Sequence, residues 1–117
     1  MAEYEVKRGN HRPQHPGFLI ADTVIPATGM SISAVSRHLG ISRQRLHSIL
    51  AERAPITPQI AARMGKLFEM NGEILLKMQA NLDYWDAQHT IDLSSVPTVS
   101  DLRRAPVSNV SKRMVTN

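Results

Sequence analysis

Apolar residues recur at helical spacing between residue 16 and about residue 88, and nothing in that region alternates as a strand would. Each periodic segment opens at a proline suited to the first helical turn or at a Ser, Thr or Asn suited to capping it. The predicted starts are Pro16, Ser31, Ser42, Thr57 followed by Pro58, and Asn71. Predicted stops include the turn from Pro26 to Gly29 and Gly40. The pattern therefore predicts five short helices joined by tight connections.

The two ends of the chain lack this periodicity. Residues 1–14 are polar and basic, which predicts a flexible arm. Its Lys7, Arg8 and Arg12 either contact DNA or remain in solvent, and we favour solvent. Residues 89–117 are rich in Ser, Val, Thr and Pro, without helical period, and predict an extended or disordered C-terminal tail. A chain of 117 residues is long enough for one small domain, which we place at residues 15–88. The expected fold class is all-α.

The second and third predicted helices meet the requirements of a helix-turn-helix. A small residue is needed where the two helices cross, and Ser36 stands four residues before Gly40. Gly40 can adopt the left-handed backbone conformation that the turn requires. Ile41 then supplies an apolar side chain to fill the angle between the helices. The segment from Ser31 to about Ala51 is therefore expected to be a DNA-binding motif.

The third predicted helix has an apolar side and a polar side. At about 100° per residue, Leu46, Ile49 and Leu50 define its buried direction. The remaining positions carry Arg43, Gln44, Arg45, His47 and Ser48. In this motif the N-terminal part of the second helix meets base edges, where Gln can pair with adenine and Arg with guanine. We therefore expect base contacts from Arg43, Gln44 and His47.

A second group of residues is expected to hold the DNA backbone. Ser42 opens the helix at an end that favours phosphate, and Arg45 and Arg53 add positive charge. Both arginines belong to a basic block, opposed only by Glu52, that comprises Arg37, Arg43, Arg45, Arg53, Arg63 and Lys66. Arg37 of this block and Ser48 of the polar side complete the residues that we expect to contact DNA. The net charge of +4 also suits a polyanionic partner. The alternative is an ordinary amphipathic surface helix whose arginines are merely solvated.

Several classes of function lack their chemistry in this sequence. There is no cysteine, which excludes disulfides, thiolate zinc sites and cysteine nucleophiles. The histidines show no metal-binding spacing with a third ligand nearby, and no phosphate-binding loop or nucleophile motif occurs. We therefore expect no enzyme, no metal and no cofactor. No apolar run approaches the ~18–20 residues of a membrane span, and no signal-peptide core is present. These features predict a cytoplasmic protein without a membrane partner.

The order of landmarks between residues 15 and 88 resembles the HigA family of bacterial antitoxins, which are phage-repressor-like helix-turn-helix proteins. The landmarks are HPG at 15–17, the turn at 26–29, GISRQRLHSIL at 40–50, ITP at 56–58, the segment from Leu75 to Gln79, and LDYW at 82–85. The chain departs from the family pattern at Phe18, at Ala51-Glu52, at Gly72 and at Ile74-Leu75. The resemblance covers about two-thirds of the chain.

This resemblance implies an antitoxin that neutralises a small ribonuclease toxin encoded in the same operon. It also implies that a homodimer represses the operon by binding a double-stranded, palindromic operator, with recognition helices about one helical turn (~34 Å) apart. The expected dimer or partner contacts are Leu82, Tyr84 and Trp85, although Tyr84 and Trp85 could instead close the core of the monomer. The expected location is the bacterial cytoplasm, on the nucleoid when bound to DNA.

Two other functions remain compatible with these residues. The chain could be a stand-alone repressor-like regulator without a toxin, which the absence of a short neighbouring toxin gene would indicate. It could also be a protein-interaction module that has lost DNA binding. That module would show no salt-dependent affinity for DNA, whereas a DNA binder loses affinity steeply as salt rises.

Overall fold

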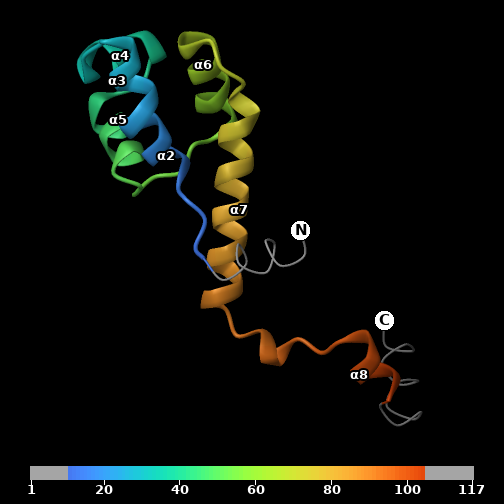
Figure 1. The fold of residues 1–117 in the computed structure, drawn as a ribbon. Coiled ribbons are helices and arrows are strands. Elements are labelled where there is room, and N and C mark those ends of the chain that lie inside the picture. Colours follow the sequence, from blue (N-terminus) through green and yellow to red (C-terminus); the bar gives the residue numbers. More distant parts are fainter. Residues whose placement is uncertain (1–10, 105–117) are drawn as a thin grey trace.

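A computed structural model describes residues 11–104, and every regular element in this range is helical (Figure 1). The first element is one continuous helix without an intervening loop. It comprises α2 (Pro16–Leu19), the π-helical segment η1 (Ile20–Val24) and α3 (Ile25–Thr28). Pro26 lies inside this element instead of ending it, because the π segment just before it accommodates the missing proline N–H. The element stops at Gly29, which has a φ of 74°.

Four more helices complete the domain: α4 (Ile32–Leu39), α5 (Arg43–Leu50), α6 (Pro58–Phe68) and α7 (Gly72–Thr90). The predicted starts are confirmed, because Ser31, Ser42, Thr57 and Asn71 each accept a hydrogen bond from a backbone N–H of the first helical turn. Pro58 occupies the first turn of α6, as expected. The all-α five-helix prediction is therefore correct for the domain.

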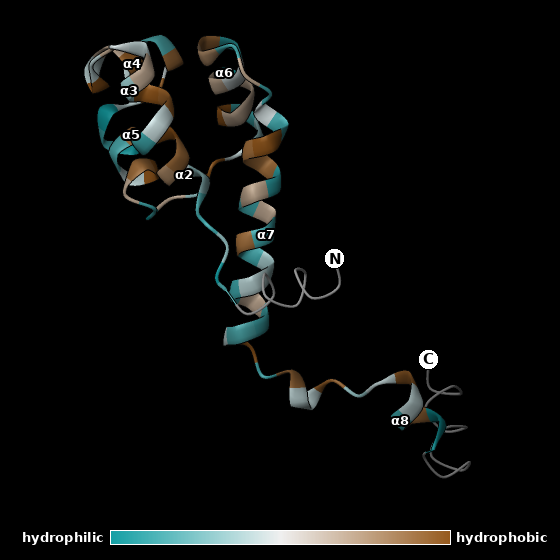
Figure 2. Ribbon diagram, viewed as in Figure 1, coloured by the Kyte–Doolittle hydropathy of each residue, from teal (hydrophilic) through white to brown (hydrophobic). Residues whose placement is uncertain are grey.

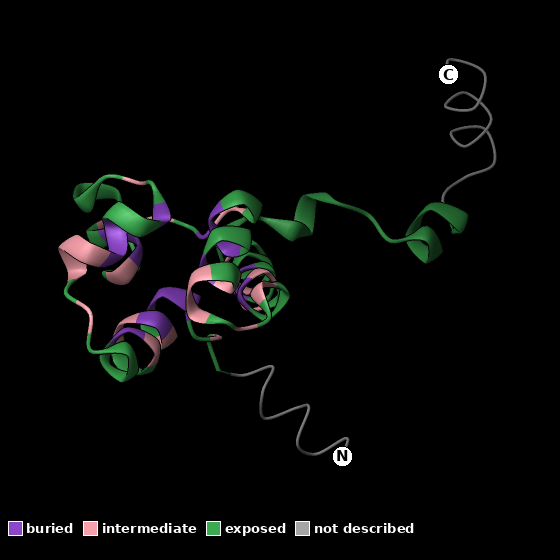
Figure 3. Ribbon diagram, turned by 90° about the horizontal axis from the view of Figure 1, so that it is seen from above, coloured by how far each residue is buried: buried purple, intermediate pink, exposed green. Residues whose placement is uncertain are grey.

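The core lies where α2 to α6 and the first half of α7 face one another, which Figure 3 shows as buried segments on the inward sides of the helices. Its buried side chains are aliphatic, as the scarcity of aromatic residues implies: Ile20, Ile25, Val35, Leu39, Leu46, Ile49, Ile56, Ile60, Ala61, Met64 and Leu75. Burial of this cluster supplies the main favourable term for folding. It also fixes which side of each helix remains in solvent.

The start of the first element packs directly on the end of α5. A Cβ atom at Gly17 would overlap the carbonyl oxygen of Ile49, so only glycine permits this approach. His15, which is 4% exposed, accepts a hydrogen bond from the Gly17 N–H through Nδ1 at 2.8 Å. The HPG segment therefore ends the arm and holds α2 against α5.

A buried amide joins α7 to the loop that precedes α6. Gln79 is 7% exposed, and its Oε1 accepts a hydrogen bond from the Ile56 N–H at 2.9 Å. Its Nε2 donates to Asp83 at 3.0 Å, so both ends of the amide are satisfied. Gly72 contributes a close contact, because a Cβ there would overlap the carbonyl oxygen of Ala61. Gln79 and Gly72 fix the position of α7 relative to α6.

Arg12, at the end of the arm, contacts α7, although its side chain remains 51% exposed. Arg12 donates two hydrogen bonds, each 2.9 Å long, to the two carboxylate oxygens of Asp86. This ion pair lowers the pKa of Asp86 and raises that of Arg12, chiefly through the hydrogen bonds between them. Lys7 and Arg8 lie outside the described residues. The chain between Arg12 and Pro16 therefore follows α7 (Figure 1).

The described part of the tail leaves the domain, as predicted, but contains helical turns that apolar periodicity did not predict. These turns are η2 (Leu93–Ser95) and α8 (Val99–Arg103). Thr98 and Asp101 form a capping box that starts α8, so a local side-chain signal determines it. Figure 2 shows that hydrophobic residues continue along this exposed segment.

Within residues 11–104, no single helix is long and apolar enough to cross a membrane. In the same described range, one bent pair of helices, Pro16–Thr28 and Ile32–Leu39 at 103°, reaches the required length and composition together.

Candidate nucleic-acid interface

Helices α4 and α5 form the predicted helix-turn-helix. Ser36 is 3% exposed and lies where the two helices approach, and its carbonyl oxygen accepts hydrogen bonds from the N–H groups of Gly40 and Ile41. Gly40 has a φ of 74°, the left-handed conformation that the turn was predicted to need. Ile41 is half-buried and packs against the core. The turn is therefore held both by backbone hydrogen bonds and by apolar packing.

The polar side of α5 faces solvent because its apolar side is buried. Leu46 and Ile49 are fully buried. The side chains of Arg43, Gln44, Arg45 and His47 are exposed, and Ser48 is half-buried. Within residues 11–104, the side chains of Arg43, Gln44 and Arg45 form no hydrogen bond or ion pair. The structure therefore places the candidate base-contacting residues together on one accessible surface.

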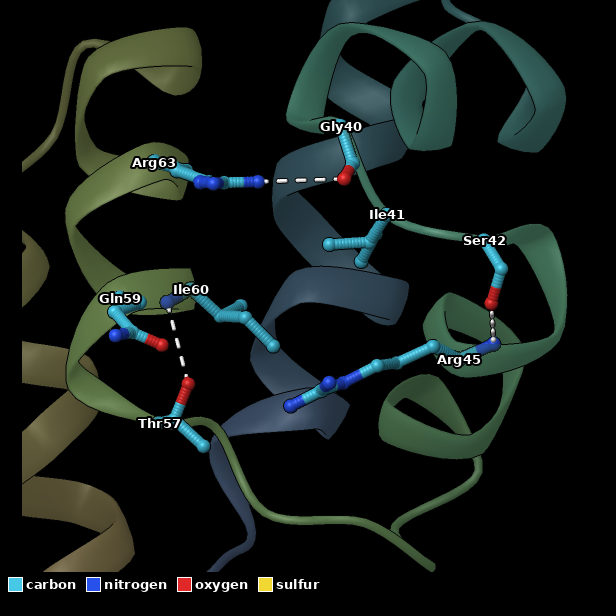
Figure 4. A pocket seen from close by; sticks show the side chains of 8 residues that line it. All are labelled: Gly40, Ile41, Ser42, Arg45, Thr57, Gln59, Ile60 and Arg63. Atoms are coloured by element: carbon cyan, nitrogen blue, oxygen red, sulfur yellow. Dashed lines mark hydrogen bonds between the residues drawn. The ribbon is translucent and has the colours of Figure 1, made fainter.

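Two shallow hollows flank this surface, and Arg45 and Ser42 border both. The first measures about 330 Å³ and lies between the turn and α6 (Figure 4), lined by Gly40, Ile41, Ser42, Arg45, Thr57, Gln59, Ile60 and Arg63. The second measures about 370 Å³ and is lined by Ser42, Gln44, Arg45, Ser48, Ala54 and Pro55. No acidic residue lines either hollow. The lining therefore favours a negatively charged ligand over a positively charged one.

Ser42 has two functions in this geometry. Its Oγ accepts a hydrogen bond of 3.0 Å from the Arg45 N–H and so caps α5. The hydroxyl proton remains available for donation, because a serine hydroxyl both donates and accepts. Ser42 can therefore start the helix and still donate to a phosphate oxygen.

Arg37 and Arg53, the two outer members of the predicted set, are exposed but line neither hollow. Arg53 lies in the loop after α5, where its N–H donates to the carbonyl oxygen of Ser48 at 2.8 Å. Arg37 lies in α4. The structure thus brings Arg53 next to the polar side of α5 and keeps Arg37 on the neighbouring helix.

Three residues of α6 and its cap belong to this surface but were not among the predicted contacts. Thr57, Gln59 and Arg63 line the first hollow, opposite α5. The available signals were the position of Arg63 in the basic block and its place outside the apolar stripe of α6. Neither signal indicates that α6 lies beside the turn, because that depends on packing.

The predicted partner contacts at the end of α7 differ in exposure. Leu82 is 2% exposed within the chain itself, so it stabilises the fold and offers no surface, which corrects its assignment. Tyr84 is 65% exposed and therefore does not close the core. Trp85 is half-buried and stacks on His89 with ring centroids 3.7 Å apart. Only Tyr84 and part of Trp85 remain as candidate contacts.

Comparison with known proteins found HTH-type transcriptional regulators, such as YbaQ of Escherichia coli (20% identical, with 82% of this chain and 88% of that chain covered), and solved structures of antidote proteins, although no family model matches the chain. An antidote protein of a plasmid maintenance system from Nostoc punctiforme is 30% identical, with 68% of this chain and 87% of that chain covered and a TM-score of 0.63. An addiction module antidote protein of a HigA family from Coxiella burnetii is 29% identical, with 75% and 98% covered and a TM-score of 0.65. The antitoxin HigA of Pseudomonas aeruginosa, solved with the higBA promoter, is 25% identical, with 69% and 97% covered and a TM-score of 0.61.

All three solved proteins are described as antidote or antitoxin proteins and none as an enzyme. They agree with the family, the fold class and the non-enzymatic function that the sequence predicts.

Proposed function

The chain belongs to the HigA family of helix-turn-helix antitoxins, and we propose that it represses its own operon by binding operator DNA through the polar side of α5. The observation that carries this proposal is that Arg43, Gln44 and His47 are exposed on a helix whose other side is buried in the core. A relative of the same fold was solved with its promoter, which supports DNA as the ligand. The site of action is then the bacterial cytoplasm, on the nucleoid.

The residues divide into two groups by the part of the DNA that they contact. Arg43, Gln44 and His47 read base edges from the N-terminal part of α5. The backbone contacts come from Ser42, Arg45 and Arg53, with Arg37 and Ser48 at the margins of the surface. Phosphate contacts provide affinity and orientation, whereas base contacts provide sequence preference.

A Gln44→Ala variant tests the base-reading role. On promoter DNA from its own operon, we expect the variant to lose about 1–3 kcal/mol of discrimination against mixed-sequence DNA. This is the usual value of one bidentate contact between a side chain and a base. Asn81→Ala is the matched control, because Asn81 is an exposed amide on α7 outside both hollows. Electrophoretic mobility shifts measure both variants. Unchanged sequence preference in Gln44→Ala would refute the base-reading role.

We further propose that two copies bind the operator as a dimer and that the same protein neutralises a ribonuclease toxin. A two-fold dimer places two recognition helices about 34 Å apart on a palindromic site. Tyr84 and the exposed edge of Trp85 are the candidate dimer contacts on α7. A Tyr84→Ala variant that remains dimeric in sedimentation experiments, with unchanged dimer dissociation, would exclude a role for Tyr84.

The toxin part of the proposal depends on the neighbouring gene. Co-expression with the product of a short adjacent reading frame should yield a stable complex that no longer cleaves RNA. Absence of any such gene, together with intact promoter binding, would identify the protein as a stand-alone regulator.

A further inference from the structure

Arg63 connects α6 to the turn of the helix-turn-helix. Its Nη1 group donates hydrogen bonds to the carbonyl oxygens of Leu39, at 2.9 Å, and Gly40, at 3.3 Å. These carbonyls belong to the C-terminal end of α4, where a cation is stabilising. The contact spans 24 residues of sequence and therefore exists only in the folded chain. A Cβ at Gly40 would stand 3.0 Å from the same Nη1 atom, so the turn and the guanidinium are closely fitted.

The guanidinium of Arg63 also borders the first hollow, and Arg45 enters the hollow from the opposite wall (Figure 4). A guanidinium has five N–H donors in a planar fork, so Nε and Nη2 of Arg63 have no acceptor among the described residues once Nη1 is engaged. The polar groups between the two arginines are Ser42, Thr57 and Gln59.

We propose that this hollow binds one backbone phosphate of the DNA, held between Arg45 and Arg63, and that Arg63 thereby couples the phosphate to the turn. The proposal rests on the proposed DNA binding and identifies a particular contact within it. A phosphodiester presents two charged oxygens, which match N–H donors arriving from two sides. The lining contains no carboxylate that would repel it.

The coupling gives Arg63 a positioning role in addition to a binding role. The turn determines the angle at which α5 leaves α4, and that angle determines where Gln44 meets the bases. A phosphate held by Nε and Nη2 orders the guanidinium, and Nη1 then keeps the two carbonyls of the turn in place. Backbone binding would thus favour the geometry in which α5 reads sequence.

Three variants separate the two roles. Arg63→Gln removes both the positive charge and the planar set of guanidinium N–H donors, whereas Arg63→Lys keeps the charge but loses the planar donors. Lys66→Gln removes one charge from an exposed position of α6 that does not line the hollow. Fluorescence anisotropy measures their affinity for a promoter duplex and for a mixed-sequence duplex over a series of salt concentrations. Circular dichroism checks that each variant is folded, and the exposure of Arg63 favours this.

The expected results differ for each variant. Arg63→Gln should reduce the slope of log affinity against log salt by about 0.9 for each copy bound, and so by about 1.8 for a dimer, because each copy loses one phosphate contact on duplex DNA. Arg63→Lys should keep the slope but lose part of the preference for the promoter duplex, roughly tenfold, because one ammonium cannot hold the turn and the phosphate together. Lys66→Gln should leave slope and preference unchanged. An unchanged slope and affinity in Arg63→Gln would overturn the proposal.

A neutral methylphosphonate introduced at single positions of the promoter duplex identifies the phosphate. At one position per half-site, the losses from methylphosphonate and from Arg63→Gln should be non-additive, because both remove the same contact. Additive losses at every position would refute the phosphate site while leaving DNA binding intact. If the wild-type protein shows no salt-dependent DNA affinity at all, the proposed function itself fails, and the phosphate site fails with it.

Discussion

Adding a methyl group at Gly17 should destabilise the domain, although the same change at an exposed helical position would stabilise it. In an unhindered helix, Gly to Ala gains about 1 kcal/mol of helix propensity. At Gly17 the new Cβ would overlap the carbonyl oxygen of Ile49 and would lie 3.0 Å from Nδ1 of His15. The carbonyl belongs to the backbone of α5 and cannot rotate away, so the first element has to move.

The magnitude follows from the cost of overpacking a core, which is typically about 1–3 kcal/mol. That cost exceeds the gain in propensity over most of its range, so we expect Gly17→Ala to lower the free energy of unfolding by up to about 2 kcal/mol. Urea denaturation, monitored by circular dichroism, measures this difference. The comparison is valid when the dependence of the unfolding free energy on urea concentration is the same in both proteins.

Ala80→Gly serves as the control, because Ala80 is exposed in the middle of α7. It should lose about 1 kcal/mol from propensity alone and so calibrates that term in this protein. A Gly17→Ala protein that is more stable than the wild type would refute the close packing of α2 on α5.

Three further changes test the cap, the left-handed residue and the arm. Ser42→Ala should lower the free energy of unfolding by about 1 kcal/mol in urea denaturation and also weaken promoter binding, whereas Ser31→Ala should lose similar stability with less effect on binding. Glu52 has a φ of 65°, so Glu52→Gly should raise the melting temperature by relieving about 1 kcal/mol of backbone strain, and a lower value would contradict this. The lowered pKa of Asp86, caused by its hydrogen bonds from Arg12, predicts an arm contact that is intact above about pH 4 and lost in more acidic solution as Asp86 becomes protonated. The Nε–H resonance of Arg12 should report this loss by NMR, and Asp86→Asn should abolish its pH dependence.

Local chemistry made the helix boundaries predictable from the sequence. Ser31, Ser42, Thr57 and Asn71 cap helices through hydrogen bonds that reach only two or three residues along the chain. Gly40 is required by a backbone conformation that other residues adopt with strain. Such signals depend on neighbours in sequence, so they are readable without the fold. The capping box that starts α8 is an equally local signal. We did not predict α8 because this capping box lies in a segment without apolar periodicity.

The candidate DNA surface was only partly predictable. The apolar positions of α5 determine its buried side, and the opposite side follows by geometry, so Arg43, Gln44 and Arg45 could be assigned to the surface. Leu82 was assigned to a partner because an apolar residue near the end of a helix has the same pattern whether another helix or another chain covers it. Its burial within the domain depends on which segments pack against α7, and only the tertiary structure determines that.

The sequence by itself thus determined the helices, the turn and the solvent-facing side of the recognition helix, because periodicity and capping act over a few residues. Only the tertiary structure decided which distant groups meet. Arg63 reaches the Leu39 carbonyl across 24 residues, Gln79 reaches Ile56 across 23, and Arg12 reaches Asp86 across 74. Each of these contacts forms after the apolar core has set the positions of the helices. No local pattern specifies the partner, since an exposed arginine has the same sequence signature in solvent and against a turn.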